Sequence, residues 1–330
     1  MKMAKVFVTG ASGMVGANLV KQLVQNKDEV TILVRKTSSH PFLDDLEVKR
    51  VYGDMGDFDS IKRGMKGSDY VYHLAGYISY NKKDRKKLFD INASGTRKVM
   101  KAALNLKIKK VVHCSSTAAI GIGDSKGDIL DEESEFKPRF KKIGYMYSKK
   151  LAEDEVLKAY QEGLNVCLVN PSSIMGAGDE KMNSGALFKN IKDNRLKAAT
   201  PGGNSIVAVS DVVEGLILAM EKGRGGRRYI LNSLNVEYID LFNVIAKVVD
   251  SKRIKRKIPK IAYYPLVFVA GLTEKVDKNA KLTPEVLFFS FRYRYFDSSR
   301  AKKELGWIPE QDLEATVREA ADYYEKRGLI

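Results

Sequence analysis

Short apolar runs alternate with segments of helical periodicity along the first half of the chain. The run from Lys5 to Thr9 leads into a glycine-rich turn, after which apolar residues recur at helical spacing from Leu19 to Val24. The same alternation predicts strands at 29–34, 48–52, 70–74, 110–114 and 166–169, and helices around 92–104 and 145–160. Strands that alternate with helices are typical of a parallel, doubly wound α/β sheet.

The first strand ends in three glycines that stand three residues apart, in the run Thr9-Gly10-Ala11-Ser12-Gly13-Met14-Val15-Gly16. Glycines at a strand-to-helix turn let backbone N–H groups approach a pyrophosphate, and the dipole of the following helix favours the anion. A purely structural turn is the alternative. We predict a dinucleotide-binding turn that uses Thr9, Gly10, Ser12, Gly13, Met14, Val15 and Gly16.

The pattern divides the chain into two regions. We expect residues 1–170 to form a Rossmann-type core, completed by about 205–232, where a helix (211–221) and a strand (228–231) are predicted. Residues 171–204 and 233–330 are expected to form a smaller, mostly C-terminal α/β substrate-binding region. The stretch from Gly121 to Gly144 holds the run Asp131-Glu132-Glu133-Ser134, which we interpret as too polar for a core. A loop of this length is expected to border the substrate.

The longest apolar run extends from Ile261 to Leu272, three residues after the basic run 252–257. It is too short for a membrane span, which needs about 20 residues. We expect a core helix of the smaller region. An apolar wall for a hydrophobic substrate and an interfacial helix on anionic lipid are the alternatives.

Composition describes an ordinary globular protein, with 44% hydrophobic residues among 330. Lysine and arginine total 57 against 41 acidic residues, a formal net charge of +16. The basic blocks are scattered and lack interleaved aromatics, so we interpret them as solvated surface and expect no nucleic-acid partner. Open alternatives are contact with an anionic membrane and steering of an anionic ligand.

The histidines and cysteines narrow the chemistry further. His40, His73 and His113 lie far apart, so no metal site is predicted. Cys114 and Cys167 lie in apolar runs, as free thiols do in a reducing compartment. Since the N-terminal residues lack the long apolar segment of a signal peptide, we expect a cytoplasmic protein.

The second predicted strand ends at Val34 and is followed by Arg35-Lys36-Thr37-Ser38. NAD-specific enzymes place an acid there for the ribose 2′-OH, whereas a cation suits a 2′-phosphate. The sequence therefore favours NADP(H) over NAD(H), with Arg35 as the phosphate partner. A solvated loop arginine is the alternative.

Other strand ends are expected to complete the cofactor site. Asp54 and Met55 would border the adenine, and small residues would let backbone approach the cofactor at Leu74, Ala75 and Gly76. Pro171, Ser172 and Ser173 would lie beside the nicotinamide. His73 is expected to be a packed structural residue, and Asn92 either supports the site or begins a helix.

Tyr145 and Lys149 stand four residues apart and therefore share one helix face. Ser115-Ser116-Thr117 follows the fifth predicted strand, next to the long loop that precedes this helix. A phenol has an unperturbed pKa of about 10, so proton exchange near neutral pH requires a nearby cation such as Lys149. Tyr145 and Lys149 are therefore candidates for proton exchange, and Ser116 can hold the substrate oxygen.

These motifs resemble the extended short-chain dehydrogenase/reductase family of the NAD-dependent epimerase/dehydratase type. The resemblance spans nearly the whole chain, through the glycine turn, Gly53-Asp54, His73-Leu74-Ala75-Gly76, Asn92-x-x-Gly95-Thr96, Ser115-Ser116, Tyr145-x-x-Ser148-Lys149-x-x-Ala152-Glu153, Asn170-Pro171 and Val209-Ser210-Asp211-Val212. It is nearest to dihydroflavonol-4-reductase-like and 3β-hydroxysteroid-dehydrogenase-like members, through residues 33–38, 169–176 and 295–307.

The resemblance implies that Ser116, Tyr145 and Lys149 form the family's triad, with Ser116 chosen because it lies five residues before Gly121. The expected function is NADP(H)-dependent reduction of a carbonyl, or oxidation of a secondary alcohol, on a small hydrophobic substrate. A nucleotide-sugar epimerase and a non-catalytic NADP(H) sensor are alternatives. The expected partner is a small-molecule substrate, and a homodimer stays open. Ala118-Ala119 replaces the Asp-Glu pair of dehydratases, and Leu168-Val169-Asn170-Pro171 replaces the Arg-Tyr-Phe-Asn of epimerases.

Overall fold

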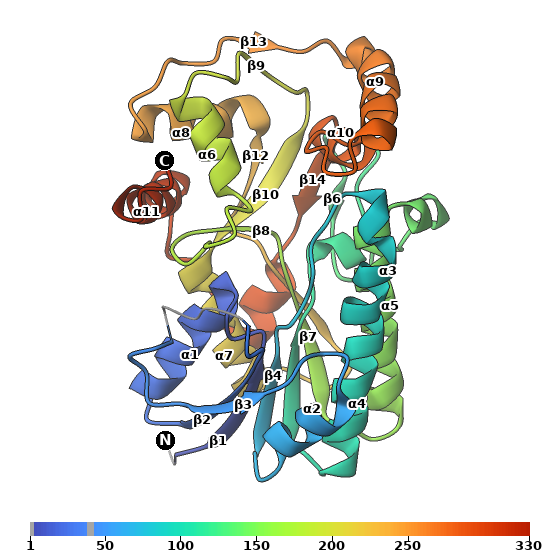
Figure 1. Ribbon diagram of the computed structural model, residues 1–330, viewed down its shortest axis with the longest axis vertical. Coiled ribbons are helices and arrows are strands. Elements are labelled where there is room, and N and C mark those ends of the chain that lie inside the picture. Colours follow the sequence, from blue (N-terminus) through green and yellow to red (C-terminus); the bar gives the residue numbers. More distant parts are fainter. Residues whose placement is uncertain (1–2, 38–42) are drawn as a thin grey trace.

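A computed structural model describes residues 3–37 and 43–330 and shows a parallel sheet flanked by helices (Figure 1). Seven strands form this sheet in the order β11-β7-β5-β4-β1-β2-β3. They are β1 (Lys5–Thr9), β2 (Glu29–Val34), β3 (Lys49–Tyr52), β4 (Tyr70–His73), β5 (Lys110–Cys114), β7 (Val166–Pro171) and β11 (Arg228–Leu231). Every neighbouring pair is parallel, which confirms the predicted doubly wound α/β sheet.

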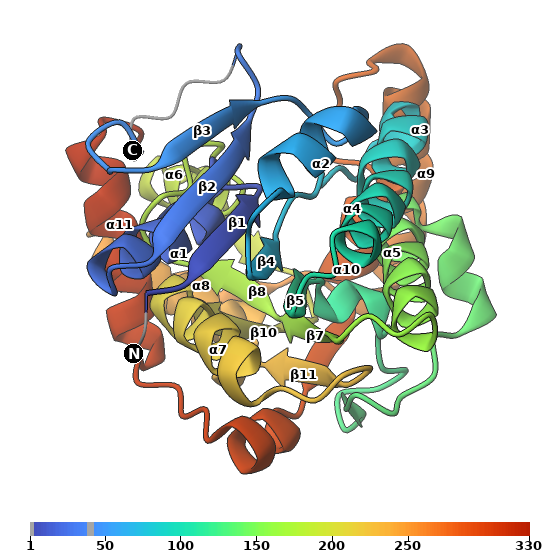
Figure 2. The same cartoon turned by 90° about the horizontal axis from the view of Figure 1, so that it is seen from below.

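Alternating side chains of the strands send apolar groups to both faces of the sheet. On β1, Val6 and Val8 pack toward α1 (Met14–Gln25) and α7 (Val209–Lys222), whereas Phe7 packs toward the other face. That face is covered by α2 (Phe58–Met65), α4 (Gly95–Asn105) and α5 (Gly144–Gln161), as Figure 2 shows. Because both faces are covered, the strands are largely buried.

A second sheet lies beyond the carboxyl ends of the first. Its strands are β12 (Leu234–Glu237), β10 (Gly203–Ala208), β14 (Tyr293–Phe296) and β6 (Ile129–Leu130) in that order, with β8 (Ser173–Met175) also paired to β10. Phe188, Ile245 and Tyr324 form a core between α6 (Gly185–Lys192), α8 (Tyr238–Val248) and α11 (Leu313–Lys326). A short pair joins β9 (Ala198–Ala199) to β13 (Arg256–Lys257).

The remaining helices are short or irregular. A short helix α3 (Arg85–Leu88) is followed by a π-helical stretch (Phe89–Ser94), which leads directly into α4. The segment predicted as one helix around 92–104 therefore begins in a wider helical turn. Near the C-terminal part, α9 (Tyr263–Val276) packs beside α10 (Pro284–Ser290). Further 3-10 or π turns cover Lys82–Asp84, Thr117–Ala119, Pro138–Lys142, Lys260–Ala262 and Ala301–Leu305.

The segment between Gly121 and Gly144 is less irregular and more buried than predicted. It supplies β6, and Phe140 is buried. The prediction that its acidic run lies outside the core is wrong for Glu132, which is 4% exposed. The Glu132 carboxylate accepts a hydrogen bond from the backbone N–H of Ile230 at 2.9 Å and lies 3.7 Å from Arg300. These partners offset the cost of burying the carboxylate.

The apolar run from Ile261 to Leu272 is helical, but the prediction of a core helix is wrong. On α9 only Ala270 and Glu274 are buried, whereas Tyr264 is 75% and Phe268 68% exposed. The composition of this run predicts burial, yet no other described element covers its outer face.

Candidate active site

The carboxyl ends of the parallel strands meet at one edge of the first sheet, and most predicted site residues follow them. Thr9 ends β1, His73 ends β4, Cys114 ends β5 and Pro171 ends β7. Ligands of open α/β sheets bind at this edge, where the order of strands reverses. In this sheet the reversal lies between β1 and β4.

Two glycines of the turn after β1 are required by internal packing. Gly10 has a φ of +76°, and a Cβ on it would lie 2.5 Å from the backbone nitrogen of Ala75. A Cβ on Gly16 would lie 2.2 Å from the carbonyl oxygen of Gly10. Both contacts are too short for any side chain. Glycine at position 10 therefore lets the turn pack against the segment after β4, and glycine at position 16 lets the start of α1 pack against the turn.

Gly13 is different, because the protein leaves space in front of it. A Cβ there would come no closer than 3.4 Å to its nearest neighbour, the carbonyl oxygen of Gly10, and the φ of −89° is open to any residue. Gly13 caps α1 without a side-chain hydrogen bond, and the first turn of α1 holds no acidic residue. The turn thus presents backbone donors and the positive end of a helix dipole, which fits a dinucleotide pyrophosphate.

His73 ties this turn to the neighbouring elements. Its ring nitrogens lie 2.7 Å from the Thr9 hydroxyl and 2.9 Å from the Thr96 hydroxyl. Burial lowers the pKa of His73 to about 3, which keeps the ring neutral. His73 is a packed structural residue, as predicted, and Thr9 serves the same network, since its hydroxyl also accepts a hydrogen bond from the Ala75 N–H at 3.3 Å.

The residues predicted to border the rest of the cofactor lie along the same edge. Arg35 is exposed at the end of β2, and Ser38 lies outside the described residues. Asp54 is exposed after β3 and accepts a hydrogen bond from the Gly56 N–H, whereas Met55 is buried and packs near Gly95. Leu74, Ala75 and Gly76 follow β4, with Gly76 exposed.

Tyr145 is the second residue of α5, and its phenol interacts with the side chain of Ser116. Ser116 begins a 3-10 turn after β5, and its hydroxyl accepts a hydrogen bond from the Ala118 N–H at 3.2 Å. The neighbouring Ser115 hydroxyl is buried without a partner among the described residues. The structure therefore brings Ser116, and not Ser115, to the phenol.

Lys149 lies one turn after Tyr145 on α5 and is 7% exposed. Its Nζ donates to the carbonyl oxygen of Cys114 at 3.3 Å and lies 3.7 Å from where a Cβ on Gly76 would stand. The ammonium thus lies between the ends of β4 and β5. Burial lowers the pKa of Lys149.

Burial also raises the pKa of Tyr145 well above its usual value. The neighbouring Tyr80 raises it further, and the groups that lower it are the Ser116 hydroxyl and the Arg294 guanidinium. The sequence predicts that Lys149 lowers this pKa. In the structure burial dominates instead, and the phenol stays protonated.

A buried network supports Ser116 from behind. The Asn170 amide donates to the Ser116 carbonyl oxygen at 3.0 Å and to the Glu153 carboxylate at 2.6 Å. Glu153 in turn accepts from Arg228 at 2.7 Å. Glu153 and Asn170 belong to the sequence motifs, but the link to Arg228 on β11 depends on the fold.

Asn92 supports the backbone near Tyr145. Its amide donates to the Tyr77 carbonyl and to the Ser148 hydroxyl, each at 2.9 Å, and its carbonyl accepts from the Tyr77 N–H at 2.8 Å. At the end of β7, Pro171 is buried, the Ser172 hydroxyl lies 3.4 Å from Asn232, and the Ser173 hydroxyl accepts from Asn204 at 2.6 Å.

Three residues near the phenol were missed by the sequence interpretation. The Tyr80 ring stands edge-on to the Tyr145 ring, with centroids 5.8 Å apart. The Arg294 guanidinium donates to the Tyr238 hydroxyl at 3.0 Å, and its Nε is buried without a partner among the described residues. Glu285 of α10 accepts from the Gly144 N–H at 3.1 Å and so caps α5. None belongs to a sequence motif, and only the fold brings them here.

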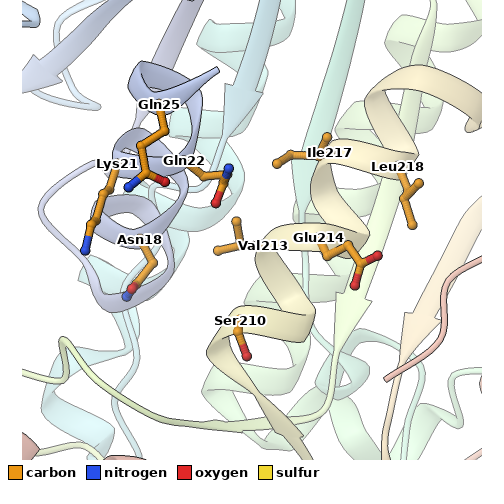
Figure 3. Close-up of a pocket in the computed structure, with 9 residues that line it drawn as sticks. All are labelled: Asn18, Lys21, Gln22, Gln25, Ser210, Val213, Glu214, Ile217 and Leu218. Atoms are coloured by element: carbon orange, nitrogen blue, oxygen red, sulfur yellow. The ribbon is translucent and has the colours of Figure 1, made fainter. Parts of the chain in front are cut away.

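A separate hollow of about 420 Å³ lies between the outer sides of α1 and α7 (Figure 3). Asn18 and Gln22 face it from α1, and Val213 and Ile217 face it from α7. It contains none of the predicted site residues, so we assign it no part in the chemistry at the carboxyl edge of the sheet.

Comparison with known proteins gives consistent matches. The model of the NAD dependent epimerase/dehydratase family matches residues 6–232. The chain is 33% identical over 335 residues to a putative dihydroflavonol 4-reductase of Synechocystis sp., covering 98% of this chain and 95% of the relative. It is 31% identical over 332 residues to sterol demethylase protein B of Methylococcus capsulatus, covering 98% and 99%. The crystal structure of gox2253 aligns with a TM-score of 0.87 at 30% identity, covering 99% of each chain.

Proposed function

The chain belongs to the NAD-dependent epimerase/dehydratase family and is an oxidoreductase of the short-chain dehydrogenase/reductase type, and we propose that it interconverts a ketone and a secondary alcohol on an apolar substrate with NADP(H). The observation that carries this proposal is the meeting of the Ser116 hydroxyl with the Tyr145 phenol, one helical turn from Lys149. This trio lies at the sheet edge that also holds the glycine turn.

Each residue of the trio has a separate task. When bound, NADPH would supply the hydride to the carbonyl carbon, and NADP⁺ would take it from the alcohol. In the reducing direction the Tyr145 hydroxyl donates its proton to the substrate oxygen, and the Ser116 hydroxyl donates a hydrogen bond to the same oxygen. Lys149 would hold the cofactor ribose, and the groups that stabilise the phenolate that remains are the Ser116 hydroxyl and the Arg294 guanidinium.

The choice of NADP(H) rests on the end of β2. Arg35 and Lys36 are both exposed there, and no acid stands at residues 35–37 to accept from a ribose 2′-OH. A guanidinium binds a phosphate with paired, charge-assisted hydrogen bonds. Arg35 is the residue we assign to the 2′-phosphate.

The apolar substrate is supported by the surroundings of the phenol. Tyr80 packs on Tyr145, and Phe289 packs on Tyr80 with ring centroids 5.1 Å apart. Aromatic walls of this kind favour apolar ligands fixed by a few polar groups. Relatives include proteins named putative dihydroflavonol 4-reductase and 3-beta-hydroxysteroid dehydrogenase, and both names refer to compounds with fused rings.

The test begins with parallel calorimetric titrations of the protein with NADPH and NADH, followed by NADPH oxidation with a panel of cyclic ketones. Tyr145→Phe is expected to bind NADPH as the unmodified protein does and to lose roughly 10²- to 10⁴-fold in kcat. Tyr147→Phe is the matched control, because Tyr147 lies on the same helix and packs against Phe89 instead.

Retention of ketone reduction by Tyr145→Phe would overturn the assigned proton donor. Conversion of a nucleotide sugar without net cofactor consumption would instead identify an epimerase. NADPH binding without turnover of any ketone or alcohol would indicate a sensor.

A further inference from the structure

One face of α9 is an apolar stripe that no other described part of the chain covers. Tyr264, Phe268, Leu272 and Val276 are spaced four residues apart and therefore line one side of α9, and Ile261 precedes them in the 3-10 turn Lys260–Ala262. We use the name α9 stripe for these five residues. In sequence order, their exposed fractions are 79%, 75%, 68%, 48% and 90%. Contiguous exposed apolar surface of this kind marks an interaction site.

The opposite face of α9 is fixed to the protein. Ala270 and Glu274 are buried, and the Glu274 carboxylate accepts from the Lys82 N–H at 2.8 Å. The Tyr263 ring packs against Phe291 with centroids 5.4 Å apart. The stripe is therefore held outward by the fold, and it is not the side by which α9 attaches to its own chain.

The chain on both sides of the stripe is strongly basic. Between residues 252 and 282 nine side chains are lysine or arginine and two are acidic, and one of those two, Glu274, is buried. Six basic residues lie in 252–260 and three in 275–281, and all nine are exposed. Figure 1 shows the segment with β13 and α9 along the same end of the molecule, away from the N-terminus.

We propose that the α9 stripe docks the protein on the surface of an anionic lipid bilayer. An apolar helix face bordered by lysine and arginine lies in the interface of such a bilayer, with the apolar side chains in the acyl boundary and the cations at the headgroups. No helix in the described part of the chain could cross a bilayer. With its 14 residues α9 is about 21 Å long, so it lies on the surface.

Charge favours a bilayer over a second copy of the chain. A symmetric dimer built on the stripe would place two identical patches face to face. The basic segments of both copies would then meet, and like charges at an interface oppose association. An anionic headgroup layer complements the same charges.

The docking surface is connected to the proposed active site. Thr283, between α9 and α10, donates to the Tyr80 carbonyl at 2.7 Å, and the Tyr80 ring packs on Tyr145. Glu285 of α10 caps the helix that carries Tyr145. Docking would therefore hold the site beside the lipid that dissolves an apolar substrate. This last step rests on the proposed function, whereas the docking itself does not.

The experiment is co-sedimentation of the full chain with vesicles of phosphatidylcholine, with and without phosphatidylglycerol, at low and high salt. Binding is expected to the anionic vesicles and to weaken with salt. Tyr264→Ser combined with Phe268→Ser is expected to lower partitioning roughly tenfold or more, because two exposed apolar side chains no longer enter the lipid. Ile308→Ser is the matched control, since Ile308 is 69% exposed outside the stripe.

Two double charge-reversal variants test whether the basic residues beside the α9 stripe contact the anionic headgroups. Lys255→Glu with Lys260→Glu is expected to remove the preference for anionic vesicles, whereas Lys302→Glu with Lys303→Glu is expected to keep it. These last two lysines are also exposed and lie next to α7. Melting temperatures establish that each variant is folded.

Absence of vesicle binding by the unmodified chain would overturn the proposal. So would a dimer in solution that Tyr264→Ser and Phe268→Ser dissociate without any change in vesicle binding. Reduction of a water-soluble ketone without lipid is expected to be the same in the stripe variant. If both the unmodified chain and the stripe variant fail to reduce any ketone, the proposed function is contradicted, and the result on vesicle binding still stands.

Discussion

The buried carboxylate of Glu153 forms an ion pair with Arg228 at 2.7 Å, and the side-chain amide of Asn170 connects this pair to Ser116. The same carboxylate accepts from Asn170, which also donates to the carbonyl oxygen of Ser116. The Glu153 side chain is 0% exposed. The position of the serine therefore depends on a charge pair behind it.

Arg228→Met is expected to lower the free energy of unfolding by about 3–5 kcal/mol, because it leaves a buried carboxylate without its cation. The midpoint of urea unfolding measures the effect. Lys5→Met is the control, since the Lys5–Glu29 pair is 3.8 Å long with both side chains at least half exposed. That variant is expected to change stability by about 1 kcal/mol or less. Equal midpoints for the two variants would contradict the assigned role of the pair.

The two glycines Gly10 and Gly13 are expected to respond in opposite ways to alanine. Gly13→Ala meets no close contact in the protein and is expected to fold normally, but to weaken NADPH binding by roughly tenfold or more, because its methyl group would enter the pyrophosphate site. Gly10→Ala is expected to destabilise the protein by more than about 2 kcal/mol, from its positive φ and its contact with Ala75. Thermal unfolding and calorimetry separate the two effects. Normal NADPH affinity in a folded Gly13→Ala would refute the placement of the pyrophosphate.

Whether the sequence predicts a residue's place depends on whether its partners are local. Tyr145 and Lys149 share a helix face, and the glycine turn follows its strand directly, so their arrangement could be predicted. The burial of Glu132 could not, because its partner Ile230 is 98 residues away. The same holds for Arg294 and Tyr80, which meet Tyr145 from distant segments. The exposed face of α9 could not be predicted either, because composition measures how apolar a helix is and not what covers it.

Arg35→Ser is expected to raise the Kd for NADPH about tenfold to a hundredfold and to leave the Kd for NADH unchanged. The reason is the loss of a charge-assisted hydrogen bond to the 2′-phosphate, which contributes about 1.5–3 kcal/mol. Calorimetric titration with both nucleotides measures it. Lys36→Ser, at the adjacent exposed position, tells whether the two cations share the phosphate. A proportional loss of both nucleotides would show that Arg35 does not contact the 2′-phosphate.

Arg294 is expected to set the pH range of the reaction through the phenol. Its guanidinium lowers the pKa of Tyr145, against the burial that raises it. Arg294→Met removes the charge, so the pKa of Tyr145 rises. Alcohol oxidation needs the phenolate and increases as pH rises through this pKa, so its activity in the variant should begin at higher pH. Ketone reduction needs the phenol and is lost as pH rises through the same pKa, so the variant should stay active to higher pH.

The measurement is the pH profile of kcat in both directions, for Arg294→Met and for Arg292→Met. Arg292 is the matched control because its guanidinium lies over the Phe288 and Tyr263 rings and is not among the groups that act on Tyr145. Its profile is expected to match the unmodified protein. A profile for Arg294→Met that stays in place, or moves to lower pH, would show that Arg294 does not act on the phenol. A rise in KM with an unmoved profile would instead assign the guanidinium to substrate binding.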